Sequence, residues 1–223
     1  AYRNLRTNNK KRYMLSASLS YDITDWLNVS GRVRVDNSNT KYEQKLYASS
    51  NTTLTEGSTQ GFYAIAKPDE SQVYADVLAN INKRFGDYSL VVNVGASIVD
   101  NKYDELSYRG PIRANGIPNV FNVFDLDNTQ KKARQDEWEE QTQSIFASAE
   151  LGWKSMLYLT LTGRNDWASQ LANSSSTCFF YPSVGLSAII SEMVKLPSAI
   201  DYLKIRGSFS SVGMPYPRNL TSP

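Results

Sequence analysis

Apolar and polar residues alternate over many short stretches of the chain, so a period of two dominates its hydrophobic pattern. Between Trp26 and Asp36 every second residue is apolar or glycine, and the residues between them are polar. Strict alternation over about ten residues is typical of a β-strand with one apolar and one polar face. It is also about the length that a tilted strand needs to cross a bilayer.

The same alternation predicts eight strands. They are expected near residues 13–21, 26–36, 73–83, 88–98, 141–153, 156–166, 180–190 and 203–212. The predicted fold class is therefore all-β, an antiparallel up-and-down meander.

The connections between these strands separate two architectures. Short turns at 22–25, 84–87 and 154–155 alternate with long polar segments at 37–72 and 99–140. Outer-membrane barrels have short turns on one side and long extracellular loops on the other. In a compact soluble domain such long loops would be unusual. The pattern favours a partial transmembrane β-barrel, and a soluble β-sandwich that binds carbohydrate or serves as a surface adhesin module is the alternative.

Composition excludes several functions. The chain has no histidine and a single cysteine, Cys178, so it lacks the commonest general base and metal ligand and cannot form an internal disulfide. Its 24 basic and 22 acidic residues are interspersed, so no patch indicates nucleic acid. No apolar run is long enough for a transmembrane helix, and the amino terminus lacks a signal-peptide pattern. We expect an internal piece of a longer protein, with signal peptide and further domains outside it.

Three segments near the carboxyl end resemble a known family. They are 159–166 (LTLTGRND), 180–185 (FYPSVG) and 200–209 (IDYLKIRGSF). In this order they are similar to barrel strands of SusC/RagA-like TonB-linked outer-membrane proteins of Bacteroidetes. The resemblance is densest over 141–213. The run after Phe209 departs from the family pattern, which leaves subfamily and substrate open.

This resemblance implies a barrel closed by a plug domain, which imports a nutrient with energy from the TonB–ExbB–ExbD complex. It also implies a SusD-like lipoprotein over the mouth and a cargo of oligosaccharides (glycans) or peptides. The expected location is the outer membrane, in contact with its lipid. The plug lies outside this chain, so we expect the chain to be part of the barrel wall.

Two sets of candidate site residues follow from the pattern. Basic and acidic side chains on the polar strand faces are expected to face the lumen or plug, because a basic side chain on the lipid face would cost about 2–4 kcal/mol. These are Arg32, Arg34, Asp36, Arg164, Asp166, Lys204 and Arg206. Aromatic residues of the long polar segments are candidates for substrate binding, or for packing between loops or against a partner. They are Tyr63, Tyr103, Tyr108, Phe124 and Trp138.

Carboxylates such as Asp100, Asp104, Asp125 and Asp127 lie in the same segments, but nothing in the sequence sets the spacing that a glycosidase needs. The residues from Asp125 onward also lack the glycine and terminal glutamate of a calcium loop. We therefore expect no catalysis, no cofactor and no metal site.

Overall fold

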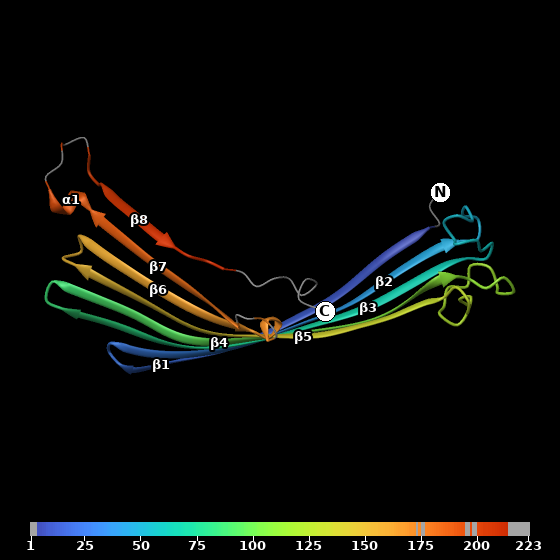
Figure 1. Cartoon of the computed structure of the whole chain (residues 1–223), viewed down its shortest axis with the longest axis horizontal. Coiled ribbons are helices and arrows are strands. Elements are labelled where there is room, and N and C mark those ends of the chain that lie inside the picture. Colours follow the sequence, from blue (N-terminus) through green and yellow to red (C-terminus); the bar gives the residue numbers. More distant parts are fainter. Residues whose placement is uncertain (1–3, 173, 175–176, 195–196, 198–199, 214–223) are drawn as a thin grey trace. The chain divides into compact units, whose positions relative to one another are not determined.

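The computed structural model describes residues 4–172, 174, 177–194, 197 and 200–213, which are mostly β-strand. Eight strands follow one another as an antiparallel meander, each hydrogen-bonded to the next along the chain (Figure 1). They are β1 (Leu5–Thr24), β2 (Leu27–Tyr47), β3 (Gly61–Phe85), β4 (Tyr88–Pro111), β5 (Lys132–Trp153), β6 (Leu157–Ala168), β7 (Cys178–Ile189) and β8 (Lys204–Ser210). A 3-10 turn, η1 (Ser169–Leu171), and one helical turn, α1 (Ile190–Met193), complete the elements. The predicted fold class is confirmed.

None of the helices among these described residues is both long and apolar enough to cross a membrane.

The first five strands are longer than predicted. The segments 37–72 and 99–140, predicted as loops, are mostly strand, and the true connections are 48–60 and 112–131. The prediction was wrong here because it relied on alternating apolar and polar residues. That alternation is lost in the added parts of these strands, where both faces are polar or, as in 61–66 (GFYAIA), both are apolar. Backbone pairing does not need that alternation, since the neighbouring strand supplies the N–H and C=O partners.

The chain divides into two compact units. Unit 1 comprises Ala1–Leu15, Val35–Gln72 and Asn101–Glu139, and unit 2 comprises Ser16–Arg34, Val73–Asp100 and Glu140–Pro223. The first five strands each contribute to both units. The division lies close to where the alternating apolar stretches end, so unit 2 holds those stretches and unit 1 holds the polar extensions.

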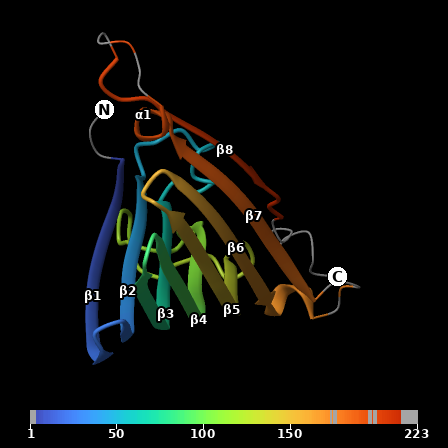
Figure 2. The same cartoon turned by 90° about the vertical axis from the view of Figure 1, so that its left-hand side faces the viewer.

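In unit 2, the strand register aligns residues of one kind across neighbouring strands, which lie side by side in Figure 2. One row consists of apolar residues that are cross-strand partners on β5 to β8: Ala149, Leu161, Val184 and Phe209. One residue away on each strand, the opposite face carries the matching polar row: Ser148, Thr162, Ser183 and Ser210. Because side chains alternate between faces, register keeps the two chemistries apart.

The apolar face of unit 2 is exposed. Leu161 is 48% exposed and Phe209 is 71% exposed. The same holds for Leu19, Val33, Val77, Val94, Ile145, Leu151, Leu186 and Ile205. A soluble sandwich would bury such a face against a second sheet. An apolar face of this extent, left uncovered, is typical of a surface that contacts lipid.

Unit 1 contains a small core beneath its two long connections. Its buried apolar side chains are Leu46, Phe62, Tyr63, Ile112 and Leu126. Ile112 and Leu126 form an antiparallel bridge, and the Ser58 hydroxyl donates to the Ile112 carbonyl over 2.7 Å. Gly61 has a φ of +119°, and a Cβ there would lie 2.7 Å from the Leu46 carbonyl oxygen. Only glycine fits this close approach, which lets 48–60 and 112–131 pack together.

Candidate functional site: the polar faces and the Trp138 pocket

The predicted lumen-facing arginines on β2 are held by side chains of β3. Arg32 forms an ion pair with Asp76 at 2.7 Å. The guanidinium groups of Arg32 and Arg34 lie 5.4 and 5.6 Å from the ring centroid of Tyr74. Tyr74 departs from the apolar–polar alternation of its strand, and this contact explains why: its ring packs under two cations on the polar face.

A chain of polar contacts, which we call the polar ladder, crosses unit 2 from β3 to β7. Its members are Asn80, Asn93, Ser148, Thr162 and Ser183. The Asn80 amide donates to Asn93, the Asn93 amide donates to Ser148 over 3.1 Å, and the Thr162 and Ser183 hydroxyls lie 2.7 Å apart. Ser148 and Thr162 are cross-strand partners. The ladder was not predicted as a set, because the sequence does not reveal the register that aligns its members.

Arg164 and Asp166, also predicted to face the lumen, bind one another and the adjacent strand. The Arg164 Nε donates to Asp166 over 2.7 Å, and a terminal nitrogen donates to the Ser144 hydroxyl over 3.0 Å. Ser144 is only 2% exposed. The guanidinium also lies 6.0 Å from the ring centroid of Phe146. These contacts fix Arg164 along the polar face.

Lys204 and Arg206 occupy β8, opposite Ile189 and Ser187 of β7. The Lys204 ammonium lies 5.7 Å from the ring centroid of Tyr158 on β6. The alternation places both side chains on the face of the polar ladder.

In unit 1, Asp36 receives two hydrogen bonds from Arg12 of β1, the one from Nε measuring 2.8 Å. The Asp36 side chain is 12% exposed and that of Arg12 is 61% exposed. The hydrogen bond and charge of Asp36 raise the pKa of the Arg12 guanidinium above its ordinary value. A bidentate pair of this kind has a defined geometry, so Arg12 is held beside the neighbouring strand rather than free in solvent.

Asp36 and Arg12 line a pocket of about 310 Å³, which we call the Trp138 pocket. Five strands contribute to it: Lys10 and Arg12 from β1, Asp36 and Ser38 from β2, Glu70, Ser71 and Gln72 from β3, Asn101 and Lys102 from β4, and Trp138 from β5. Polar side chains therefore surround one large aromatic ring. The sequence indicated only Asp36 and Trp138; continued alternation beyond Asp36 would have added Ser38.

Trp138, which lines this pocket, stacks on a second predicted aromatic residue, Tyr103, which is not among the pocket's lining residues. The rings of Tyr103 and Trp138 are stacked, with centroids 5.5 Å apart and planes at 12°. Tyr103 also donates a hydrogen bond to Glu105. Burial, this hydrogen bond and nearby carboxylates raise the pKa of Tyr103 to about 12, so its phenol stays protonated at neutral pH. Both residues lie on strands rather than on loops, which corrects the prediction.

The remaining aromatic candidates lie elsewhere in unit 1. Tyr63, on β3, is buried, and its hydroxyl donates to Glu43 over 2.8 Å. Phe121 packs against Tyr63 and Tyr47, with ring centroids 6.2 and 5.0 Å away. Tyr108 lies on β4 and not on a loop. Phe124 lies in the connection 112–131 and is 80% exposed, with Arg113 over its ring.

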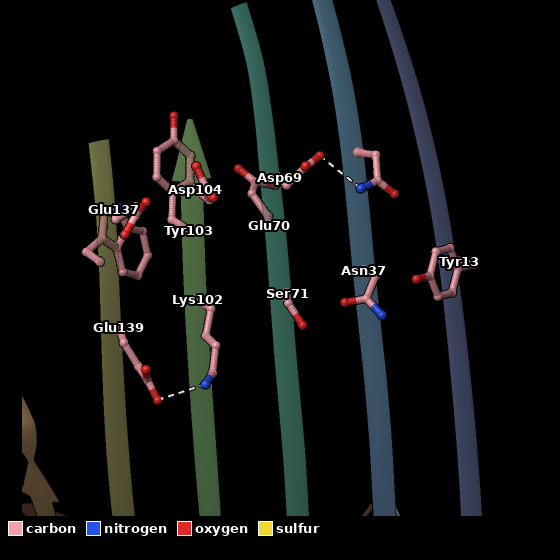
Figure 3. A pocket seen from close by; sticks show the side chains of 12 residues that line it. Tyr13, Asn37, Asp69, Glu70, Ser71, Lys102, Tyr103, Asp104, Glu137 and Glu139 are labelled. Carbon is pink, nitrogen blue, oxygen red and sulfur yellow. Dashed lines mark hydrogen bonds and ion pairs between the residues drawn. The ribbon is translucent and has the colours of Figure 1, made fainter. Parts of the chain in front are cut away.

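A second hollow in unit 1 has a volume of about 520 Å³ (Figure 3). Polar side chains line it at positions where the same strands carry apolar side chains in unit 2. Its labelled side chains come from five strands and are mainly acidic or amide: Asn37, Asp69, Asp104, Glu137 and Glu139, with Lys102 paired to Glu139 at 3.0 Å. By alternation they occupy the positions that are apolar in unit 2. No group of three acidic or cysteine side chains in the described part of the chain is placed to hold a metal. This surface suits contact with water.

Comparisons with known proteins identify the family. The family model described as TonB dependent receptor-like, beta-barrel, matches residues 1–223. None of the curated proteins matches the chain.

Among solved structures, the RagAB peptide transporter is similar with a TM-score of 0.77 and 14% identity, covering 93% of this chain and 23% of that one. The ferric preacinetobactin receptor BauA from Acinetobacter baumannii has a TM-score of 0.53 and 16% identity, covering 82% of this chain and 29% of that one. These likenesses show the fold, and they show that the chain spans about a quarter of such receptors.

The predicted family and location agree with these findings, and the family is one of receptors and transporters rather than of enzymes. The exposed apolar face, the polar ladder and the family match lead to one conclusion. This chain belongs to the TonB-dependent receptor-like β-barrel family and forms part of an outer-membrane barrel wall.

Proposed function

We propose that this chain is a wall segment of a TonB-dependent importer that takes up a polar oligomer, an oligosaccharide, through the outer membrane. In this proposal unit 2 carries the membrane-spanning parts of the strands, with its apolar face toward lipid. The polar ladder and the charged residues beside it face the water and plug inside the barrel.

The observation that carries the proposal is the segregation of chemistry between two faces of the same strands. Leu161 is exposed on one face, while its sequence neighbour Thr162 is hydrogen-bonded to Ser183 on the other. An apolar exterior around a polar, hydrogen-bonded interior is the arrangement of a barrel that conducts polar material through lipid. The same inner face offers partners to a plug, because Arg164 and Asp166 keep exposed parts.

Energy coupling and partners follow from the family. We infer that the plug of the full receptor contacts the TonB–ExbB–ExbD complex. A SusD-like lipoprotein above the connections 48–60 and 112–131 is the expected partner of the SusC/RagA branch. The likeness to RagAB, named as a peptide transporter, supports that branch and keeps oligopeptides as the second cargo class.

Uptake in cells tests the proposal. Cells with the full receptor are compared with cells that lack either the receptor gene or the gene for TonB. We expect labelled oligosaccharides to enter only when both genes are present. Uptake that persists without TonB would contradict energy-coupled import. Uptake of oligopeptides but not of oligosaccharides would show that the cargo is peptide and not sugar.

A further inference from the structure

The Trp138 pocket contains a buried hydroxyl group, that of Ser38, which has no hydrogen-bond partner among the described residues. Ser38 is 5% exposed. Ser38 lines the pocket from β2. Because a buried hydroxyl without a partner loses free energy of hydration, it favours a bound molecule that supplies a hydrogen bond.

The charges in the pocket are already compensated. Arg12 pairs with Asp36, and Lys10 pairs with Glu70 at 3.5 Å. Lys102, the third cation, pairs with Glu139 at 3.0 Å. A pocket without an unbalanced charge gives little preference to an ionic ligand, since no net attraction offsets the cost of dehydrating an ion. It suits a neutral molecule with many hydroxyl groups.

The hydrogen-bonding groups are of the kind that neutral hydroxyls need. The Gln72 amide donates to the Asn101 carbonyl oxygen over 2.8 Å, which leaves the second donor of Gln72 and the amide nitrogen of Asn101 for other partners. Arg12 and Asp36 present a donor and acceptor pair side by side. Arg12 has five N–H groups and uses two of them on Asp36, so it has further donors for a hydroxyl.

Trp138 supplies a flat apolar surface for the ligand. Its ring is held parallel to Tyr103 at 5.5 Å, so the indole has a defined orientation before a ligand arrives. A sugar ring carries C–H groups on its face and hydroxyls at its edge, and the C–H face packs on a flat aromatic surface. The pocket volume of about 310 Å³ lies at the small end of ligand sites, which suits a short unit of a longer oligomer.

We propose that the Trp138 pocket binds a sugar unit of a neutral oligosaccharide, which stacks on Trp138 and bonds to Ser38 and to the Gln72–Asn101 and Arg12–Asp36 pairs. This inference rests on the proposed function, because it makes the pocket a binding site for the transported substrate on the barrel wall. It adds the ligand chemistry, neutral and hydroxyl-rich, and the residues that recognise it.

Binding to the purified full receptor in detergent tests the pocket. The probes are neutral hexose hexamers, maltohexaose, cellohexaose and mannohexaose, and an uncharged hexapeptide, each measured by titration calorimetry. We expect at least one sugar to bind, and Trp138→Ala to weaken it at least tenfold. Ser38→Ala should weaken it about threefold to tenfold, whereas Trp138→Phe should retain most of the affinity.

Two controls separate binding from folding. Phe85→Ala removes an aromatic that is 47% exposed at the end of β3, outside the pocket, and should leave sugar affinity unchanged. Each variant must also keep the heat-modifiable migration of the folded barrel on gels; a Trp138→Ala receptor that fails this check is replaced by Trp138→Leu.

The outcomes distinguish the pocket from the importer. Equal sugar affinities in wild type, Trp138→Ala and Ser38→Ala would overturn the proposal that this pocket binds sugar. Binding of the peptide but of no sugar would overturn it as well. If TonB-dependent uptake of sugar continues in either case, the proposed function stands without this pocket. Absence of any TonB-dependent uptake contradicts the proposed function itself.

Discussion

The ring of Phe146 on β5 lies against Gly95 on β4, so closely that a Cβ at position 95 would be 2.6 Å from the ring. The same Cβ would lie 2.8 Å from the Val77 carbonyl oxygen on β3. Gly95 therefore lets a large ring pack on the polar face of unit 2, beside Arg164.

Replacing Gly95 with alanine should destabilise the barrel, because both the Phe146 ring and a backbone oxygen must move. Overpacking of this kind typically costs about 1–3 kcal/mol. Urea unfolding of the full receptor in lipid vesicles measures the change. The matched control is Gly207→Ala on β8, where an added Cβ meets nothing within 4 Å. Equal destabilisation by both variants would contradict the packing account.

Exchanging a side chain on each face tests the orientation of the wall. Leu161→Arg should cost about 2–4 kcal/mol if Leu161 contacts lipid near the bilayer midplane. Thr162→Arg, one residue further on the opposite face, should cost far less, since its side chain points into a polar surrounding. Insertion yield and urea unfolding in vesicles report both values. If Thr162→Arg cost more than Leu161→Arg, the face of Thr162 would be the one in contact with lipid, and the proposed orientation would be contradicted.

The polar ladder should behave as a coupled unit. Asn93→Ala leaves both Asn80 and Ser148 without their bonds to this side chain. We expect a loss of about 1–3 kcal/mol. Because Asn80→Ala breaks one of the same bonds, the double variant should lose less than the sum of the two single variants. Strictly additive losses, measured by urea unfolding, would argue against the ladder.

The Tyr63–Glu43 pair predicts a dependence on alkaline pH. Burial and the bond to Glu43 raise the pKa of Tyr63 well above its ordinary value. Its contribution to stability is thus complete below about pH 10, the unfolded value, and is lost as pH rises through the raised folded value. Tyr63→Phe should remove this alkaline loss.

Hydrogen exchange of the connections 48–60 and 112–131, followed against pH, measures the effect, because Tyr63 belongs to the core that anchors them. The bond from Tyr63 also lowers the pKa of Glu43, so the contribution of Glu43 is lost as pH falls through that lowered value. Glu43→Gln should reduce this acid loss. An exchange rate independent of pH in wild type would refute the role of the pair.

Alternation in the sequence was sufficient to predict the eight strands and which face is polar. It put Arg32, Arg34 and Arg164 on a polar face, but their contacts with Asp76, Tyr74 and Asp166 come from the structure. It failed in 37–47 and 61–72, where β2 and β3 continue although the alternation has ended. Alternation marks only the part of a strand that has one apolar face, so it ends where that face ends, although the backbone pairing continues.

The sequence by itself therefore determined the family, the strands and the division into apolar and polar positions, because each depends on local patterns. Only the tertiary structure decided which side chains meet. Strand register, which no local pattern specifies, aligns Ser148 with Thr162 and Thr162 with Ser183. Likewise, the pairing of five strands brings Ser38, Gln72 and Trp138 from distant parts of the chain to one pocket.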